Sequence, residues 1–333
     1  MVLIIAEIGV NHNGDIKKAK KLIEIAAEAG ADVVKFQTFT SEDLTTNYAP
    51  LAEYQVKNSP ELKDQSNLLK KLELKDEDHF TLKNYSEKFG VEFLSTAFTV
   101  KSVDILSKLG LKRWKIPSGE INNFNLLEKI ARLNQPIILS TGMSNLGEIE
   151  SAINILTSNN LSKDKITILH CNTAYPTPME DVNLNVLKTL RSSFGVNVGY
   201  SDHTLGIEVS TAAVALGSTI IEKHITLDRN LPGPDHKASL EPNEFKNLVK
   251  NIRNVSLALG SSIKKPTKSE RINIKIARKS IVASKVINIG EIFTNENLTS
   301  KRPATGVPPN LMNLIVGKKS NRYYDVDDQI EIL

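Results

Sequence analysis

Two histidines lie at comparable places in the sequence, each near the end of a short apolar run. His203 ends the run Val196–His203, and His224 lies near the end of the next run, Thr219–Thr226. Continuous runs of Val, Ile and Leu are typical of buried parallel strands. Imidazoles at the ends of neighbouring strands can reach one divalent ion, and such a pair suits Mn, Fe, Co or Zn as a Lewis acid. The alternative is that each histidine is a core residue bonded to the backbone.

Two lysines lie inside other apolar runs, where an unpaired charge is costly. Lys35 lies in Ala31–Thr38, and Lys115 lies in Arg113–Glu120. We interpret them as the cationic part of a pocket for an anionic substrate. Hydroxyls of the kind that coordinate phosphate also close runs: Ser118, Ser140 and Ser201. In the alternative interpretation, one lysine forms a Schiff base with a carbonyl substrate, as in metal-independent aldolases.

Two glutamates supply candidate proton carriers. Glu7 lies in the first apolar run, where its carboxylate could hold a metal-bound water or an acceptor hydroxyl. Glu120 follows Ser118 by two residues. Because strand side chains alternate between faces, we expect Glu120 to point toward the same side as Ser118 and to act as an acid or base. Alternatively, Glu120 is the salt-bridge partner of Lys115.

Eight apolar runs with these polar ends predict the fold that positions them. Helical patterns with one apolar stripe lie between the runs, and strand–helix alternation indicates a parallel sheet. In a (β/α)8 TIM barrel all carboxyl ends of the strands face one mouth, where active sites form. The predicted strands are Leu3–Gly9, Ala31–Thr38, Val91–Phe98, Arg113–Glu120, Pro136–Gly142, Lys165–Asn172, Val196–His203 and Thr219–Thr226.

The chain is longer than one barrel requires. We expect a catalytic barrel over residues 1–260, a basic linker over 261–280 and a small domain of short strands over 281–333. A domain of about 50 residues is marginally stable alone, so it should dock on a barrel, its own or a partner's. The polar connection from Thr38 to Leu74 is unusually long and should overhang the mouth.

Composition excludes several classes of protein. The net charge is +4 with scattered lysines, which does not indicate a nucleic-acid footprint. No run reaches the ~18 apolar residues of a membrane span, and no basic segment begins a signal peptide. The single cysteine, Cys171, permits no intrachain disulfide and is expected to be a buried thiol. These features favour the cytoplasm. His79, in a charged helical segment, is expected to be solvated.

The motifs together resemble the sialic acid synthase family, the phosphoenolpyruvate-dependent condensing enzymes of nonulosonic acid synthesis. The C-terminal motifs resemble the antifreeze-like (SAF, or β-clip) domain that follows the barrel in that family. The overall fold class is therefore α/β, a TIM barrel followed by this small domain. The matching segments are AEIGVNHNG, VKFQTF, FLSTAF, KIPSGE, ILSTGMSNLGEIE, LHCNTAYPTP, GYSDHT, EKHITLD, PGPDHKASLEP, RKSIVA and KRPATG.

The resemblance implies a reaction and a role for each residue. C3 of phosphoenolpyruvate attacks the aldehyde of an open-chain N-acetylmannosamine-type sugar, water adds at C2, and phosphate leaves by C–O cleavage. A divalent metal assists, with Mn as first choice and Mg or Co as alternatives. By matching motif, His203 and His224 are the metal ligands, and Glu7 orients water or sugar. The phosphoenolpyruvate carboxylate is held by Lys35, Thr96 and Lys115, its phosphate by Ser118, Ser140 and Ser201, and the sugar by Gln37, Glu120, Tyr175 and Asp235.

The resemblance also implies a partner and leaves the sugar open. Arg302, in KRPATG, matches an arginine that the family inserts into the partner's barrel, which implies a domain-swapped homodimer. Thr173 and Arg278 depart from residues found in some members, and both lie near the expected sugar end. The preferred product is N-acetylneuraminate. The alternatives are diacetyllegionaminate, made from 2,4-diacetamido-2,4,6-trideoxymannose, then pseudaminate. Outside this family, the alternatives are the lysine-dependent aldolase and a non-catalytic sugar- or ice-binding protein.

Overall fold

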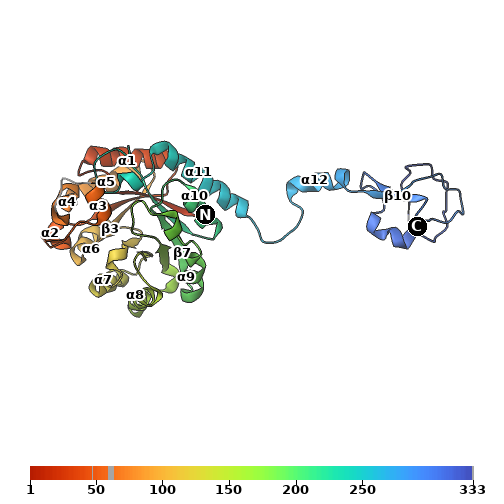
Figure 1. Cartoon of the computed structure of the whole chain (residues 1–333). Helices are drawn as coiled ribbons and strands as arrows, with labels where there is room; N and C mark the ends of the chain where they lie inside the picture. The colour runs from red at the N-terminus through yellow and green to blue at the C-terminus, as the bar shows by residue number, and fades with distance from the viewer. Residues whose placement is uncertain (47, 59–63, 332–333) are drawn as a thin grey trace. The chain divides into compact units, whose positions relative to one another are not determined.

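A computed structural model describes residues 1–46, 48–58 and 64–331 of the chain. The chain divides into two compact units, Met1–Gly260 and Ser261–Leu333. Figure 1 shows the helices and strands of both units. In the described part of the chain, no helix is both long and apolar enough to cross a membrane.

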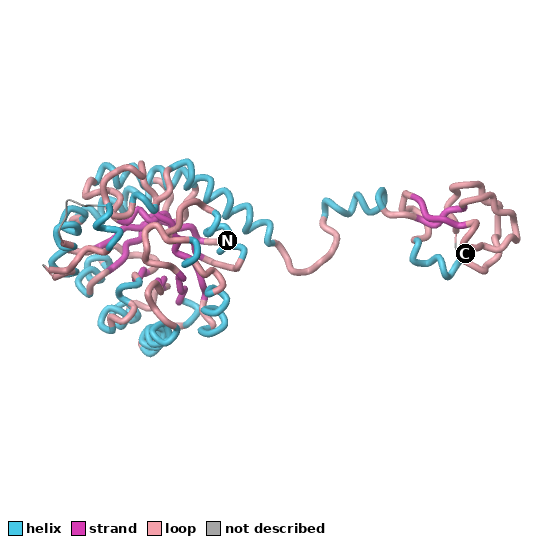
Figure 2. The backbone as a smooth tube through the Cα atoms, viewed as in Figure 1, coloured by secondary structure: helices cyan, strands magenta, loops and turns pink. Residues whose placement is uncertain are grey.

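Eight parallel strands close into a barrel in the first unit, which confirms the predicted fold class. Each strand pairs with the next along the chain, and β1 closes the barrel on β8. The strands lie inside this unit with helices around them (Figure 2). They are β1 (Leu3–Gly9), β2 (Val33–Thr38), β3 (Glu92–Ala97), β4 (Trp114–Ile116), β5 (Ile137–Ser140), β6 (Ile166–His170), β7 (Asn197–Asp202) and β8 (Ile220–His224).

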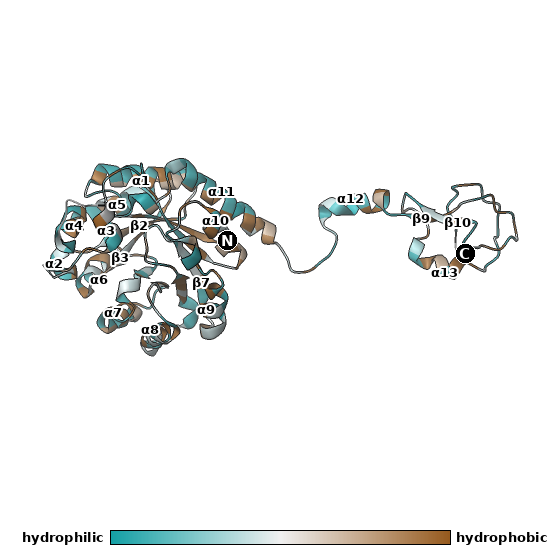
Figure 3. Ribbon diagram, viewed as in Figure 1, coloured by the Kyte–Doolittle hydropathy of each residue, from teal (hydrophilic) through white to brown (hydrophobic). Residues whose placement is uncertain are grey.

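Amphipathic helices cover the outside of the barrel, with hydrophilic and hydrophobic residues on each (Figure 3). Helix α1 (Ile16–Ala29) begins at Asp15, whose carboxylate accepts a hydrogen bond from the amide of Lys17, and ends at Gly30 with φ of 88°. The other helices against the barrel are α5 (Asp76–Lys88), α6 (Val100–Ser107), α7 (Phe124–Arg132), α8 (Leu146–Ser158), α9 (Val186–Phe194), α10 (Glu208–Ala215) and α11 (Pro242–Leu259).

The barrel interior is layered. Buried apolar side chains form a small cluster inside the barrel: Ile5, Val33, Leu94, Ile138, Leu169 and Ile220. Each of Ile5, Val33 and Ile220 is followed two residues later on its strand by a charged residue that faces the same way. These charged residues are Glu7 on β1, Lys35 on β2 and Glu222 on β8. The apolar layer therefore closes the barrel beneath the polar side chains at its carboxyl end.

The connection after β2 is not the plain polar loop that the sequence predicts. It contains three short helices: α2 (Ser41–Leu44), α3 (Glu53–Asn58) and α4 (Gln65–Leu72). Leu68 and Leu72 of α4 pack with Val10 and Phe39 in a separate apolar cluster, which gives the segment its own core. Residues 47 and 59–63 of this connection lie outside the described residues.

Two further predictions are wrong. The predicted strand Arg113–Glu120 ends at Ile116, because Pro117 has no amide hydrogen for the ladder and Ser118–Glu120 turn into a 3-10 helix, η1. The alternation argument therefore does not apply to Glu120. His79 is 1% exposed, not solvated, and its Nε2 lies 2.7 Å from Thr38 Oγ1, so it is a core residue.

The second unit has a small core of its own. Strands β9 (Ser280–Ala283) and β10 (Leu298–Lys301) pair antiparallel, and short helices α12 (Lys268–Ala277) and α13 (Met312–Ile315) accompany them. Helix α12 occupies half of the segment 261–280 that was expected to be a linker, and none of its side chains is buried. The core contains Ile281, Ala283, Ile287, Phe293, Leu298, Ile315, Tyr324 and Ile330.

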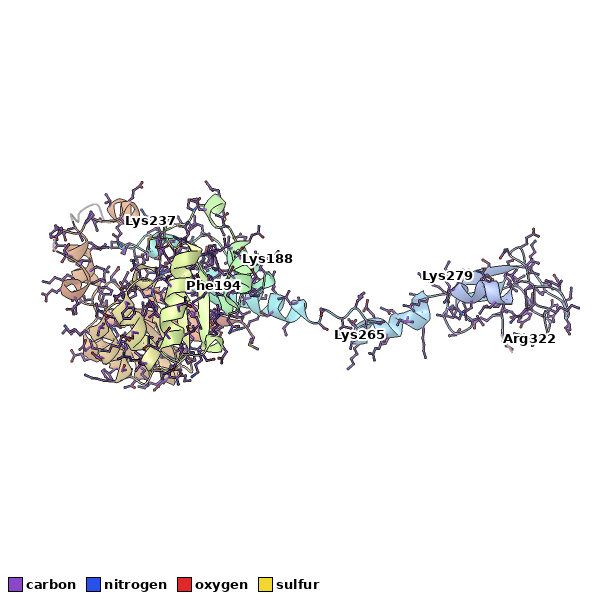
Figure 4. The ribbon with its side chains drawn as sticks, turned by 90° about the horizontal axis from the view of Figure 1, so that it is seen from below. Lys188, Phe194, Lys237, Lys265, Lys279 and Arg322 are labelled. Carbon is purple, nitrogen blue, oxygen red and sulfur yellow. The ribbon has the colours of Figure 1, made fainter. Side chains whose placement is uncertain are left out.

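Basic side chains are spread over the chain. Of those labelled in Figure 4, Lys188 and Lys237 belong to the first unit, and Lys265, Lys279 and Arg322 belong to the second.

Truncating the apolar layer should destabilise the barrel. We expect Leu94→Ala to lower the free energy of unfolding by about 2–5 kcal/mol, because Leu94 is fully buried and its loss leaves a cavity. Leu257→Ala, at an α11 position that is 79% exposed, is the matched control and should change it by less than ~0.5 kcal/mol. Urea denaturation of both variants gives the comparison, and equal effects would refute the layered interior.

Candidate active site

A cavity of about 510 Å³ opens at the carboxyl ends of the strands. Its walls come from the strand ends and from the α2–α4 segment. Every site residue predicted in the first unit lines it: Glu7, Lys35, Gln37, Thr96, Lys115, Ser118, Glu120, Ser140, Tyr175, Ser201, His203, His224 and Asp235. Arg302 belongs to the second unit, is exposed, and donates from Nε to the carbonyl of Ala277.

Both lysines are buried beside carboxylates. Lys35 Nζ lies 3.0 Å from Glu7 Oε2 and 3.6 Å from Glu222 Oε2, and it also donates to Thr96 Oγ1 at 3.0 Å. Lys115 Nζ donates to Ser140 Oγ at 2.7 Å and to Glu222 Oε1 at 3.2 Å. Both lysines are 3% exposed, so these contacts replace the water that the charges lose.

Glu222 is the site residue that the sequence analysis missed. Its carboxylate contacts both lysines and accepts a hydrogen bond from Ser201 Oγ at 2.8 Å. A signal was available, because Glu222 precedes His224 by two residues on one strand and so shares its inward face.

The ionisation of these groups leaves the cavity floor positive. Burial would raise the pKa of Glu222, but Lys115 and Lys35 outweigh it and lower the pKa to about 2. Burial would lower the pKa of Lys35, but Glu222 and Glu7 outweigh it and raise the pKa. Burial raises the pKa of Glu7 to about 7, against the opposing effect of Lys35. Burial lowers the pKa of Lys115, and Glu222 opposes that effect. Below about pH 7, where Glu7 is protonated, the lysines Lys35 and Lys115 face the single carboxylate of Glu222, an arrangement that favours an anionic ligand.

The two histidines are neutral and close together, with ring centroids 5.5 Å apart. Burial lowers the pKa of His203 to about 4 and that of His224 well below its usual value. His203 Nδ1 donates to the carbonyl of Asn172 at 2.6 Å, which leaves the lone pair on Nε2. His224 Nδ1 is buried and has no hydrogen-bond partner among the described residues. The ring of Tyr175 stacks on His203 at 4.1 Å.

Near Ser118, the backbone of Gly142 lies close to neighbouring side chains of the cavity wall. Ser118 Oγ accepts a hydrogen bond from the amide of Gly142 at 2.9 Å and lies 3.4 Å from Cys171 Sγ. A Cβ on Gly142 would lie 2.7 Å from Thr173 Cγ2, so no larger residue fits without a shift. Cys171 is 6% exposed, which confirms the buried thiol.

The other three residues predicted to contact the sugar, Gln37, Glu120 and Asp235, lie in different surroundings. Gln37 Nε2 donates to Glu7 Oε1 at 3.4 Å. Glu120, in η1, is half-buried and accepts from Asn123 Nδ2 at 2.6 Å. Asp235 is buried, and burial raises the pKa of its carboxyl to about 7.

One wall of the cavity is apolar. It is lined by Phe39, Leu44, Leu68, Leu69, Leu72 and Phe98, most of them from the α2–α4 segment. Leu44, Leu69 and Phe98 are half-buried, so they retain surface that a ligand could cover. The cavity thus combines a charged floor with an apolar side.

Family models match both units. Residues 22–264 match the model of the NeuB family, and residues 278–323 match the SAF domain. The chain belongs to the NeuB family. This finding confirms the resemblance drawn from the motifs and the SAF identity of the C-terminal domain. It also disfavours a non-catalytic binding protein, since the relatives below are synthases.

Three similar proteins are named synthases of this family. The chain is 53% identical to the N,N'-diacetyllegionaminic acid synthase of Campylobacter jejuni, covering 98% of each chain. It is 47% identical to the synthase of that name from Legionella pneumophila, covering 95% of this chain and 89% of the other. It is 38% identical to human N-acetylneuraminate-9-phosphate synthase, and the match covers 98% of this chain and 90% of the human one.

A solved NeuB-type structure has the same fold. The N-acetylneuraminic acid synthetase of Leptospira borgpetersenii, in complex with citrate, is 36% identical with a TM-score of 0.73. The match covers 82% of this chain and 90% of that one.

Asp235 should make the stability of this NeuB-family barrel depend on pH. Its pKa is raised from 3.8 to about 7, so its contribution is fully present below about pH 4 and is lost as pH rises through 7. Asp235→Asn should therefore raise the free energy of unfolding at pH 8 by a few kcal/mol, on the order of the linkage for such a shift. The difference should shrink toward pH 4 in urea titrations.

Asp104→Asn is the control, because Asp104 lies exposed on α6. Its effect should not change with pH in this way. A constant difference between wild type and Asp235→Asn from pH 4 to pH 8 would contradict the buried, protonated state of Asp235.

Proposed function

We propose that the chain condenses phosphoenolpyruvate with 2,4-diacetamido-2,4,6-trideoxymannose and water, giving N,N'-diacetyllegionaminate and phosphate. The observation that carries the proposal is the 53% and 47% identity, over nearly the whole chain, to two proteins named N,N'-diacetyllegionaminic acid synthase. These relatives favour the alternative over the N-acetylneuraminate product preferred from the sequence. Proteins named pseudaminic acid synthase are only 33–34% identical.

The charged floor is suited to phosphoenolpyruvate. In the proposal, Lys35, Lys115 and Thr96 hold its carboxylate, and Ser118, Ser140 and Ser201 hold its phosphate. The two buried lysines support this assignment, because they share the carboxylate of Glu222, and the second carboxylate beside Lys35, that of Glu7, has its pKa raised to about 7. Fixed donors and charges in a water-poor cavity need no rearrangement when charge develops in the reaction.

The histidine pair fits a divalent metal. Both imidazoles are neutral, and the buried Nδ1 of His224 has no hydrogen-bond partner among the described residues, so its lone pair is available to an ion. Among the described residues, no set of three or more His, Cys, Asp or Glu side chains is placed to hold an ion. We therefore assign His203 and His224 as the ligands, with the other positions left to water and substrate. When bound, the ion would polarise the acceptor aldehyde, with Mn as first choice and Mg or Co as alternatives.

In the proposed reaction, carboxyl groups of the site donate and accept protons. C3 of phosphoenolpyruvate bonds to the aldehyde carbon, and the aldehyde oxygen takes a proton and becomes a hydroxyl. The C2=C3 π electrons form the new bond, so water bonds to the electron-poor C2 and loses a proton. The C2–O bond then breaks, phosphate leaves with the bonding electron pair, and the C2 hydroxyl loses its proton to become the ketone of the open-chain product. Because the pKa of Glu7 is raised to about 7, its carboxyl group can donate or accept a proton at neutral pH. Glu7 also orients water or the sugar. Glu120 is the second proton carrier, and Gln37, Tyr175 and Asp235 contact the sugar.

The lysine-dependent aldolase is not favoured. A Schiff base requires a neutral amine, but Lys35 and Lys115 both lie beside the ionised carboxylate of Glu222. Burial does lower the pKa of Lys115, although Glu222 opposes that effect.

The second unit completes the proposal. We propose a catalytic barrel over residues 1–260, a connector over 261–280 and a SAF domain over 281–333 that presents Arg302 to the barrel of a partner in a domain-swapped homodimer. The guanidinium can form two hydrogen bonds with an N-acetyl carbonyl of the sugar, which a lysine cannot reproduce. The exposed position of Arg302 within its own unit supports this role. We place the enzyme in the cytoplasm.

Phosphate release tests the choice of sugar. We expect kcat/KM with Mn to be much higher for 2,4-diacetamido-2,4,6-trideoxymannose than for N-acetylmannosamine, because the apolar wall should favour the 6-methyl group over a hydroxyl. Leu69→Asn should reduce that preference about tenfold, the scale of one methyl contact in a pocket. Leu257→Asn, exposed on α11, should leave it unchanged. A wild-type preference for N-acetylmannosamine would refute the proposed product.

Arg302→Ala tests the swapped domain. We expect the KM for the sugar to rise at least about tenfold, while the KM for phosphoenolpyruvate stays within about twofold, because the arginine contacts only the N-acetyl group. Arg302→Lys should behave like Arg302→Ala, and Arg322→Ala in the same unit should behave like wild type. Steady-state kinetics with each substrate varied gives both constants. Equal rises in the two KM values would contradict the assignment.

A further inference from the structure

Two buried charges lie directly beside the proposed metal ligands but outside the cavity. Asp202 is the last residue of β7 and directly precedes His203, and Lys223 precedes His224 on β8. Because side chains alternate along a strand, these two point away from the barrel interior while both histidines point into it. Both side chains are 0% exposed, and Lys223 Nζ lies 3.0 Å from Asp202 Oδ2.

The pair also fixes the backbone that follows His203. Asp202 Oδ1 accepts hydrogen bonds from Thr204 N at 2.9 Å and Thr204 Oγ1 at 2.7 Å. Lys223 Nζ donates to the carbonyl of Thr204 at 2.5 Å. Ser210 Oγ, on α10, donates to Asp202 Oδ2 at 2.6 Å. The turn that follows His203 is therefore held by both charges and anchored to the helix behind the barrel.

The strands β7 and β8 are thus joined through side chains on both faces. On the inner face Ser201 donates to Glu222, and on the outer face Asp202 pairs with Lys223. Both contacts join residues that are direct partners in the strand register. The separation of the two imidazoles depends on the relative position of these two strand ends.

A buried ion pair is a weak source of stability. Removing two charges from water costs about as much as their attraction returns, and apolar replacements are often neutral or stabilising. This pair is not needed to bind a charged substrate, because it faces helix α10 and not the cavity. Its contacts concentrate instead on the residues that flank the two histidines.

We propose that Asp202 and Lys223 are positioning residues that hold His203 and His224 at the separation needed to bind a divalent ion. The inference rests on the proposed metal role of the two histidines. Groups that orient metal ligands from behind typically change metal affinity by about 10–100-fold when removed. The pair should therefore set the affinity of the metal site without contacting either metal or substrate.

The test measures Mn²⁺ binding by the full-length protein, from the electron paramagnetic resonance signal of free Mn²⁺, together with urea unfolding. We expect Asp202→Asn to raise the Kd for Mn²⁺ about 10–100-fold and to leave phosphoenolpyruvate affinity, measured without Mn²⁺, within about threefold. Ser210→Ala removes one donor to Asp202 and should raise the Kd by a few fold. If Asp202→Asn does not fold, the Kd of the Ser210→Ala variant for Mn²⁺ tests the proposal in its place.

A double variant separates positioning from stability. Asp202→Asn combined with Lys223→Met leaves no unpaired buried charge, so its free energy of unfolding should recover toward that of wild type. Its Kd for Mn²⁺ should stay high, because no ammonium group at position 223 then holds the carbonyl of Thr204 after His203. If Mn²⁺ affinity recovers together with stability, the pair is only structural and the inference is wrong.

A less buried ion pair, away from the carboxyl ends of the strands, provides the control. Glu92 starts β3 and accepts from Arg113 Nε at 2.7 Å, far along the strand from the carboxyl end. Glu92→Gln should lower stability and leave the Kd for Mn²⁺ unchanged, and an equal rise in Kd would overturn the inference. His203→Ala should abolish tight Mn²⁺ binding. If His203→Ala binds Mn²⁺ normally, the proposed metal site itself is wrong, whereas normal binding by folded Asp202→Asn alone refutes only the positioning role.

Discussion

The site depends on keeping two ammonium groups charged inside a barrel. Lys35 and Lys115 cannot reach bulk water, and the carboxylate of Glu222 lies between them as their shared partner. An ion pair of this kind tolerates burial only when geometry and hydrogen bonds compensate for the lost hydration. Thr96, Ser140 and Ser201 supply those hydrogen bonds from three further strands. Two of the hydroxyls assigned to phosphate, those of Ser140 and Ser201, thus also hold the charges in place.

The layered interior strengthens this arrangement. The apolar cluster beneath the charged floor closes the barrel, and it leaves the mouth as the way in for substrates. In a site with little water, each charge interacts more strongly with its neighbours than it would at the surface. The raised pKa of Glu7 and the lowered pKa of Glu222 are two results of one environment, and they differ because Glu222 contacts both lysines.

The fold and most of the site were predictable, because side chains at alternate positions of a buried strand share one face, so one inward-facing residue identifies the others. That rule places Lys35, Thr96, His203 and His224 correctly, and it would also have found Glu222. It fails at Glu120, because Pro117 ends β4 and a 3-10 turn takes over. The burial of His79 and the helices after β2 depend on contacts between distant segments, such as the contact of His79 with Thr38, which no local pattern contains.

The single cysteine has a practical consequence. Cys171 lines the same cavity as the charged floor, and its sulfur lies next to Ser118 in the proposed phosphate subsite. Because the sequence has no other cysteine, a thiol-directed label small enough to reach this buried sulfur would attach at one known place without mutagenesis. A bound anion that reaches Ser118 would shield that sulfur, so the rate of labelling becomes a direct reading of how full the cavity is. The protein therefore contains a built-in reporter of ligand occupancy that works even for ligands that never react.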